Sequence, residues 1–155
     1  LKNRPAKPLA VMLKDISTAR RECDFGEVQE KLLTGWQKPI VLLDKKTSGS
    51  LCESVAPENP TVGVMLPYAP LHLLLFDYDD GMEMTDSLVM TSGNVRGAPI
   101  CRSDEDALSE IAGFCDLILS HNRRILIRSD DTVMDTFEGK PYIISVQEDM
   151  HHCLL

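Results

Sequence analysis

The stretch from residue 88 to residue 100 is the feature that most constrains how this chain can fold. Its first three residues, Leu88–Met90, are apolar and predict the end of a buried strand. The chain then turns through TSGN, in which Gly93 permits a positive φ and the close approach of another molecule. Ser92 and Asn94 place a hydroxyl and an amide beside this backbone. Small polar residues after a strand form either a ligand crevice at a sheet edge or a plain tight turn, and this stretch alone leaves both interpretations open.

Short apolar runs alternate with amphipathic segments along the chain. This pattern predicts a three-layer α/β (α+β) domain with a twisted mixed β-sheet flanked by helices. The expected strands lie at 9–13, 39–43, 61–67, 88–90, 116–119, 125–127, 132–134 and 142–145. The expected helices lie at 16–22, at 27–33, after Pro70, and between Ser103 and Gly113. The sheet should be mixed because the strands near 125–127 and 131–134 are too close in sequence for a helical crossover.

Several side chains have expected structural roles. Asp15 and Ser103 are expected helix N-caps because their side-chain oxygens accept hydrogen bonds from the first turn. Trp36, the only tryptophan, is expected to be a packing anchor. Three leucines are expected to form the core face of the helix after Pro70: Leu71, Leu74 and Leu75. His72, in the same helix, is expected to be a satisfied core or edge residue rather than a ligand or a base.

The composition is that of an ordinary globular chain. It has 155 residues, of which 43% are hydrophobic and 26% are charged, and this suits one domain. The formal net charge of −8 argues against a broad basic face and non-specific nucleic-acid binding. No apolar run reaches the roughly 18 residues of a membrane span, and no signal peptide is visible. The five cysteines are odd in number, widely spaced and without a CxxC pair, which predicts free thiols and a cytoplasmic location.

A local basic cluster stands at the beginning of this acidic chain. Lys2, Arg4 and Lys7 are three cations within six residues of a proline-stiffened segment. An anionic ligand such as a nucleotide phosphate needs this kind of positive charge, since arginine grips oxygens bidentately and lysine acts as a point charge. A solvated basic terminus explains the same residues and is left open.

Three segments carry possible metal ligands, and we expect no metal site of the protein's own. The acidic turn at 77–81 lacks calcium-loop spacing and is interpreted as a solvated loop. Asp130 and Asp131 beside Arg128 suit either a magnesium ion or a salt-bridged turn. The last candidates are His151, His152 and Cys153. They are contiguous, whereas a tetrahedral metal site needs ligands that are spaced along the chain. The sequence leaves open whether they bind anything.

Four segments resemble, in order, the motifs of the YrdC-like domain family. Residues 2–12 (KNRPAKPLAVM) resemble its KxRPxxKPxAxM segment, and residues 63–72 (GVMLPYAPLH) resemble GVMLPYTPLH. Residues 90–100 resemble MTSGNxxGxPI, and residues 121–133 resemble HDRPIxxRCDDSV. The resemblance covers about residues 2–144. Within the family it is strongest to the version inside the HypF carbamoyltransferases of nickel–iron hydrogenase maturation.

The resemblance implies an adenylate-forming enzyme. The YrdC-like domain would join carbamate, made from carbamoyl phosphate elsewhere in a HypF protein, to ATP with Mg²⁺. This reaction releases pyrophosphate and forms carbamoyl adenylate. The carbamoyl group would then pass to a cysteine of a HypE-like acceptor protein, and no membrane is involved.

The resemblance also assigns site residues. Lys2, Arg4, Ser92 and Asn94 match the family's Lys-Arg-Ser-Asn set and are the candidate catalytic residues. The wider expected nucleotide-binding set is Lys2, Arg4, Lys7, Thr91, Ser92, Gly93, Asn94, Arg128, Asp130 and Asp131. The two cations would neutralise charge that builds on the α-phosphate. Ser92 and Asn94 would hydrogen-bond phosphate oxygens or the planar carbamoyl group, so that positioning replaces a protein nucleophile.

Two further expectations concern the extent of the domain and its competing functions. The resemblance implies a YrdC-like domain over residues 1–144 that lacks the family's N-terminal strands, followed by an atypical C-terminal tail over 145–155. One alternative is threonylcarbamoyl-adenylate synthesis for tRNA modification. The other is a double-stranded-RNA-binding module, which is not favoured because the net charge is −8.

Overall fold

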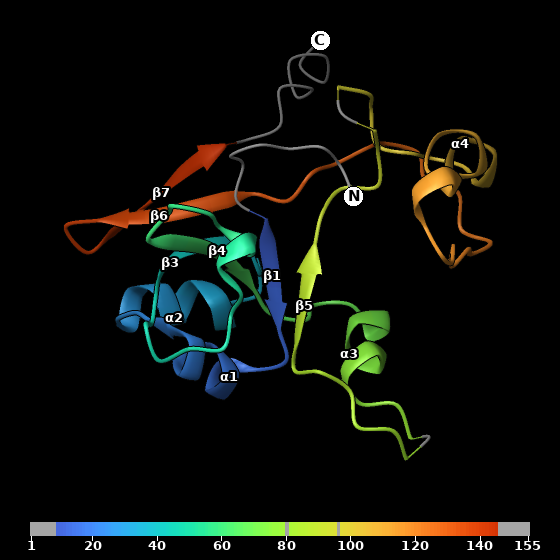
Figure 1. Ribbon diagram of the computed structural model, residues 1–155. Helices are drawn as coiled ribbons and strands as arrows, with labels where there is room; N and C mark the ends of the chain where they lie inside the picture. Colours follow the sequence, from blue (N-terminus) through green and yellow to red (C-terminus); the bar gives the residue numbers. More distant parts are fainter. Residues whose placement is uncertain (1–8, 80, 96, 146–155) are drawn as a thin grey trace, which may run out of the picture. The chain divides into compact units, whose positions relative to one another are not determined.

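The computed structural model describes residues 9–79, 81–95 and 97–145 (Figure 1). The chain divides into two compact units. The sheet unit comprises Ala6–Met90 and Asp131–Leu155, and the loop unit comprises Leu1–Pro5 and Thr91–Asp130. Every strand of the described residues belongs to the sheet unit.

A mixed sheet of seven strands forms the sheet unit. The order is β5-β1-β4-β3-β6-β7, and β2 pairs with β3. Two pairs are parallel, β1 with β4 and β3 with β6, and the others are antiparallel. The bounds are β1 (Ala10–Leu13), β2 (Cys23–Asp24), β3 (Ile40–Lys45), β4 (Thr61–Met65), β5 (Ser87–Met90), β6 (Val133–Phe137) and β7 (Lys140–Ser145). The prediction of a mixed sheet is confirmed.

Two expected strands, at 116–119 and 125–127, are wrong. The described residues of the loop unit contain no strand, and both apolar runs are exposed: Leu117 is 91% and Ile127 is 74% accessible. A short apolar run does not by itself specify a strand, because a strand also needs a neighbour to accept its backbone hydrogen bonds. The tight connection of the mixed sheet is instead the β6–β7 hairpin, which turns at Glu138 and Gly139 with φ of 49° and 72°. Positive φ at both central residues matches the right-handed twist of a hairpin.

Four α-helices and two short 3₁₀ helices complete the described structure. Their bounds are α1 (Ile16–Glu22), α2 (Glu27–Thr34), α3 (Pro70–Phe76), α4 (Asp104–Glu110), η1 (Glu53–Val55) and η2 (Ala112–Phe114). Both expected N-caps are confirmed. Thr18 N donates to Asp15 Oδ1 at 2.7 Å, and Asp106 N donates to Ser103 Oγ at 3.1 Å. Each cap satisfies one of the donors that a helix start leaves without an intrahelical partner.

The hydrophobic core of the sheet unit lies on both faces of the sheet. On one face, Ala19 of α1 and Leu33 of α2 are buried in one cluster with Val11, Val41 and Val64 of three strands. Figure 1 shows these two helices next to each other beside the sheet. On the other face, Phe76 of α3 packs with buried methionines of β1 and β4. Alternate strand residues therefore serve opposite clusters, as the pleat requires, and helices flank the sheet as predicted.

Two core predictions are wrong. Leu71, Leu74 and Leu75 of α3 are 47%, 49% and 38% exposed, whereas Phe76 is 6% exposed. This helix has only seven residues and contacts the sheet through its last one, so its leucine face stays accessible in the sheet unit. Trp36 is 89% exposed because it stands in the turn after α2 has ended, outside the packed face of that helix.

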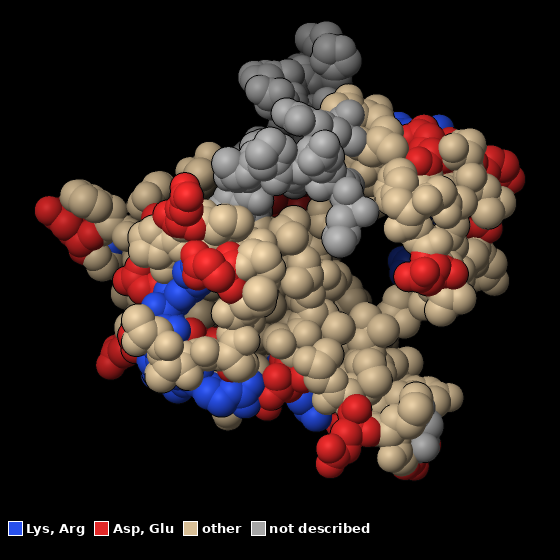
Figure 2. Space-filling model, viewed as in Figure 1, with Lys and Arg blue, Asp and Glu red and all other residues tan. Residues whose placement is uncertain are grey.

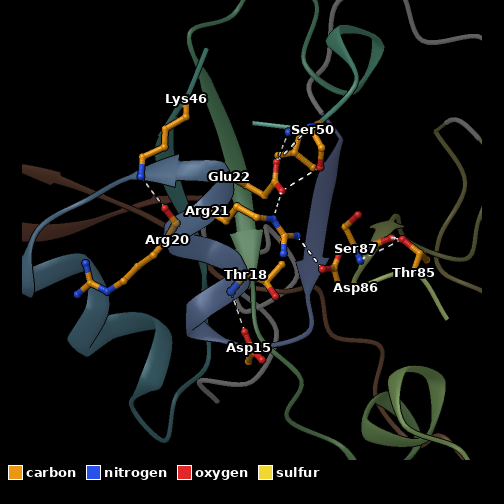
Figure 3. A network of polar contacts seen from close by, with 11 residues as sticks. Asp15, Thr18, Arg20, Arg21, Glu22, Lys46, Ser50, Thr85, Asp86 and Ser87 are labelled. Atoms are coloured by element: carbon orange, nitrogen blue, oxygen red, sulfur yellow. Dashed lines mark hydrogen bonds and ion pairs between the residues drawn. The ribbon is translucent and has the colours of Figure 1, made fainter. Parts of the chain in front are cut away.

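A buried carboxylate organises the end of α1 (Figure 3). Glu22 is only 1% exposed, and its two oxygens accept four hydrogen bonds. Ser50 supplies two, from its N at 2.5 Å and its Oγ at 2.9 Å, Leu51 N supplies one at 3.2 Å, and Arg21 Nε supplies one at 2.8 Å. Burial would raise the pKa of Glu22, but the bonds from Arg21 and Ser50 outweigh it and the pKa lies below its ordinary value.

The same network reaches the start of β5. Arg21 Nη2 donates to Asp86 Oδ2 at 2.7 Å, and Lys14 N donates to Asp86 O at 2.9 Å. Figure 3 shows Arg21 between Glu22 and Asp86. Since Asp86 directly precedes β5, the network fixes the beginning of the strand that leads to the central loop.

Glu22→Gln tests the buried carboxylate. We expect the free energy of unfolding at pH 7 to fall by about 1–3 kcal/mol, because an amide cannot accept all four bonds. The folded pKa of Glu22 lies below its ordinary value of 4.5, so its contribution is complete above pH 4.5 and is lost as the pH falls through the folded pKa. Urea denaturation of both proteins at pH 7 and at stepwise lower pH measures the difference, which should shrink in acid.

The matched control is Glu27→Gln. Glu27 is on the surface of α2, 90% exposed, and its nearest cation, Lys31 Nζ, is 3.9 Å away. Such exposed pairs contribute little, so this variant should unfold like the wild type at every pH. Equal losses in the two variants would contradict a special role for Glu22.

Candidate functional site

The central loop, residues 91–101 of the loop unit, places two polar side chains together. Ser92 Oγ donates to Asn94 Oδ1 at 2.7 Å, and Asn94 Nδ2 donates to Ala98 O at 2.5 Å. Both Ser92 and Asn94 are half-buried. The hydroxyl and the amide that the sequence singled out are thus held in a defined relative position by the loop's own contacts.

The backbone of the central loop closes on itself. Cys101 N donates to Gly93 O at 2.8 Å, and Ala98 N donates to Val95 O at 3.1 Å. Gly93 does not use the positive φ that a glycine permits, whereas Gly97 adopts one, with φ of 79°. Apart from the two chain neighbours of Gly93, no described residue has an atom within 4 Å of the place a Cβ would take there. The loop is therefore a closed turn with open space at its first glycine.

Arg128 contacts the end of this loop. Its Nε donates to Ile100 O, and its Nη2 lies 3.7 Å from Asp106 Oδ2. The Asp106 carboxylate also accepts from Arg102 N at 2.9 Å and Ser103 N at 3.2 Å. The bond from Arg102 is the largest of the effects that hold the pKa of Asp106 below its ordinary value, and the Arg128 charge adds to it.

A second group of polar side chains lies in the sheet unit. Tyr68 Oη donates to Asp131 Oδ1 at 3.4 Å, and the rings of Tyr68 and His72 meet edge-to-face with centroids 4.6 Å apart. Burial, followed by the Asp131 charge, raises the pKa of Tyr68. His72 Nδ1 is buried with no hydrogen-bond partner among the described residues, so the expectation of a satisfied histidine is wrong at this atom. Sequence reasoning missed the Tyr68–Asp131 contact, although both residues stand in segments that resemble family motifs.

The candidate residues divide between the two units. Lys2, Arg4 and Lys7, like His151, His152 and Cys153, lie outside the described residues. Six of the described candidate residues belong to the loop unit: Thr91, Ser92, Gly93, Asn94, Arg128 and Asp130. Asp131 belongs to the sheet unit. The described residues hold no cluster of three His, Cys, Asp or Glu side chains suited to a metal ion. In the same part of the chain, no helix has the length and apolar character to cross a membrane.

A family model and several curated proteins match this chain. The Sua5_yciO_yrdC family model, described as telomere recombination, matches residues 1–145. The carbamoyltransferase HypF of Synechocystis sp. is 40% identical over 143 residues, which is 92% of this chain and 18% of that protein. The HypF of Rhizobium leguminosarum bv. viciae is 39% identical over 89% of this chain and 18% of its own length. The chain thus spans less than a fifth of these relatives.

Solved structures give the same grouping. A full-length HypF in a phosphate- and nucleotide-bound form superposes with a TM-score of 0.84 at 41% identity, covering 91% of this chain and 21% of that one. T. kodakarensis HypF has the same TM-score and identity over 91% of this chain and 18% of its own. P. abyssi Sua5 complexed with L-threonine reaches 0.72 at 20% identity over 92% and 41% of the two chains, a likeness that concerns the fold. The predicted YrdC-like fold is confirmed.

Gly97→Ala and Gly93→Ala form a matched pair for the central loop. Alanine at position 97 must adopt a positive φ, which costs about 1–2 kcal/mol, whereas alanine at 93 meets open space. Hydrogen exchange of residues 91–101 should therefore accelerate in the first variant and stay unchanged in the second. Equal acceleration in both would contradict this description of the loop.

Proposed function

This chain belongs to the Sua5/YciO/YrdC family, and from that premise we propose that it binds ATP and forms carbamoyl adenylate, as part of a HypF-like carbamoyltransferase. The observation that carries the proposal is the identity of about 40% to HypF proteins over most of this chain. These relatives are named carbamoyltransferases, and one solved HypF holds phosphate and nucleotide. The further role in nickel–iron hydrogenase maturation, and the cytoplasmic location, follow from this assignment.

The proposed reaction needs positioning rather than a protein nucleophile. A carbamate oxygen attacks the α-phosphorus of ATP, the bond from that phosphorus to the bridging oxygen breaks, and pyrophosphate leaves. The Ser92 hydroxyl donates its one hydrogen to Asn94 Oδ1 at 2.7 Å, so it would turn from this partner to donate to a phosphate oxygen or to the carbamoyl group. Lys2 and Arg4 would supply positive charge to the phosphates as negative charge develops.

Magnesium would enter with the nucleotide. Mg²⁺ commonly keeps several waters and is bound through substrate phosphates with one or two carboxylates. Asp130 and Asp131 are the carboxylates of the proposed nucleotide set that would contribute, and the ion would shield the pyrophosphate charge.

Sequence identity favours carbamate over threonine-derived substrates. Identity to HypF structures is 41%, and identity to P. abyssi Sua5 structures is 20–22%. The acceptor of the carbamoyl group would then be a cysteine of a HypE-like protein. RNA is the less favoured ligand because the net charge is −8. In Figure 2 the described acidic side chains are scattered, and the described basic ones gather mainly in one short band with a few standing apart.

Calorimetric titration with ATP and Mg²⁺ tests nucleotide binding. Ser92→Ala and Lys2→Ala should each weaken the affinity about tenfold, the equivalent of one lost hydrogen bond or ionic contact. Ser48→Ala, at an exposed serine of the sheet unit, is the matched control and should bind like the wild type. A folded wild-type chain that fails to bind ATP would refute the proposal.

Pyrophosphate release identifies the substrate. Ammonium carbamate should support release from ATP, and threonine with bicarbonate should not. The reverse pattern would assign the chain to threonylcarbamoyl-adenylate synthesis instead. Ser92→Ala should reduce the rate with carbamate, whereas Ser48→Ala should leave it unchanged.

A further inference from the structure

With the described residues, Arg128 makes its polar contacts inside the loop unit. Its Nε donates to the Ile100 carbonyl, and its Nη2 approaches Asp106 Oδ2 at 3.7 Å. The Arg128 side chain is 33% exposed, so about two thirds of its surface is covered. One guanidinium therefore connects the end of the central loop to the first turn of α4.

Asp106 makes this connection firm. It is the third residue of α4, and its Oδ2 accepts from Arg102 N and Ser103 N while its own N donates to Ser103 Oγ. These reciprocal bonds form a capping box, which fixes the start of a helix. Arg128 thus connects the Ile100 carbonyl to the start of α4, which the capping box already fixes.

Ile100 is linked to the polar pair of the loop through the backbone. Cys101, the next residue, donates its N–H to Gly93 O at 2.8 Å. Gly93 stands between Ser92 and Asn94, the residues whose side chains are 2.7 Å apart. The conformation of that pair therefore depends on where the 100–101 segment is held.

We propose that Arg128 is a positioning residue, which sets the conformation of the central loop through Ile100 and Asp106, rather than a ligand of the nucleotide phosphates. Its charge is paired with a carboxylate and its Nε is directed at a backbone carbonyl. The consequence for ATP affinity rests on the function proposed above, whereas the consequence for the loop does not.

Substitutions that separate charge from geometry test the positioning role. Arg128→Ala should weaken ATP–Mg²⁺ affinity about tenfold, the loss equivalent to one hydrogen bond. Arg128→Lys should lose nearly as much, because an ammonium lacks the planar fork that reaches Ile100 and Asp106 together. A phosphate contact that depends on charge alone would survive with lysine, so normal affinity in Arg128→Lys would indicate a phosphate ligand. Arg124→Ala, at an exposed arginine of the loop unit, is the control and should bind normally.

A double-mutant cycle with Ser92→Ala adds a second criterion. If Arg128 acts through the loop, the double variant should bind little more weakly than Ser92→Ala, because the loop's polar pair is already lost. If Arg128 contacts phosphate independently, the two losses should multiply to about a hundredfold. Multiplicative losses, or rescue by lysine, would overturn the proposal.

Alkylation of Cys101 tests the loop without any nucleotide. Cys101 is partly buried beside Ile100, and burial raises the pKa of its thiol, so it should react slowly with a maleimide. Arg128→Ala should speed its modification severalfold, measured by peptide mass spectrometry, while the exposed Cys115 serves as an internal reference. An unchanged Cys101 rate would refute the positioning role. Failure of the wild type to bind ATP, with Cys101 accelerated as expected, would instead refute the proposed function alone.

Discussion

The buried carboxylate of Glu22 is the interaction on which the sheet unit depends most. A charge at 1% exposure is unfavourable unless hydrogen bonds compensate for lost water, and here four donors do so. Those donors come from the segment after β3 and from Arg21, so compensation of one charge fixes several pieces of chain. Arg21 extends the effect to Asp86 at the start of β5. The start of β5, the strand that precedes the central loop, is therefore held by this ion pair.

The parts of the fold that were predictable depend on local chemistry. Asp15 and Ser103 cap helices through hydrogen bonds that span three residues, and such short-range bonds can be predicted from the sequence. The strands at 10–13 and 61–65 followed from apolar runs that do find neighbours in the sheet. The run at 116–119 also contains three consecutive apolar residues, and it pairs with no strand among the described residues. The difference lies in pairing between distant segments, which composition does not encode.

The candidate site shows the same division. Ser92 and Asn94 were identified from their sequence context, and their mutual hydrogen bond spans only two residues. The contact from Arg128 to Ile100 spans 28 residues, and nothing in either segment alone predicts it. A motif resemblance marks Arg128 without saying what it touches, so the positioning role proposed for it rests on the contacts in the structure.

A tight turn and a ligand loop, the two interpretations open from sequence, are not true alternatives. A loop that binds without a large loss of entropy must already be ordered, and the bonds that order the central loop are those of a closed turn. Beyond its chain neighbours, no described residue has an atom within 4 Å of a Cβ placed at Gly93. The shared fold at 20% and at 41% identity makes the complementary point, because a sheet kept across such divergence does not choose a substrate. In the proposed function, specificity would then arise in loops of this kind, where a few hydrogen bonds would determine which acyl group fits.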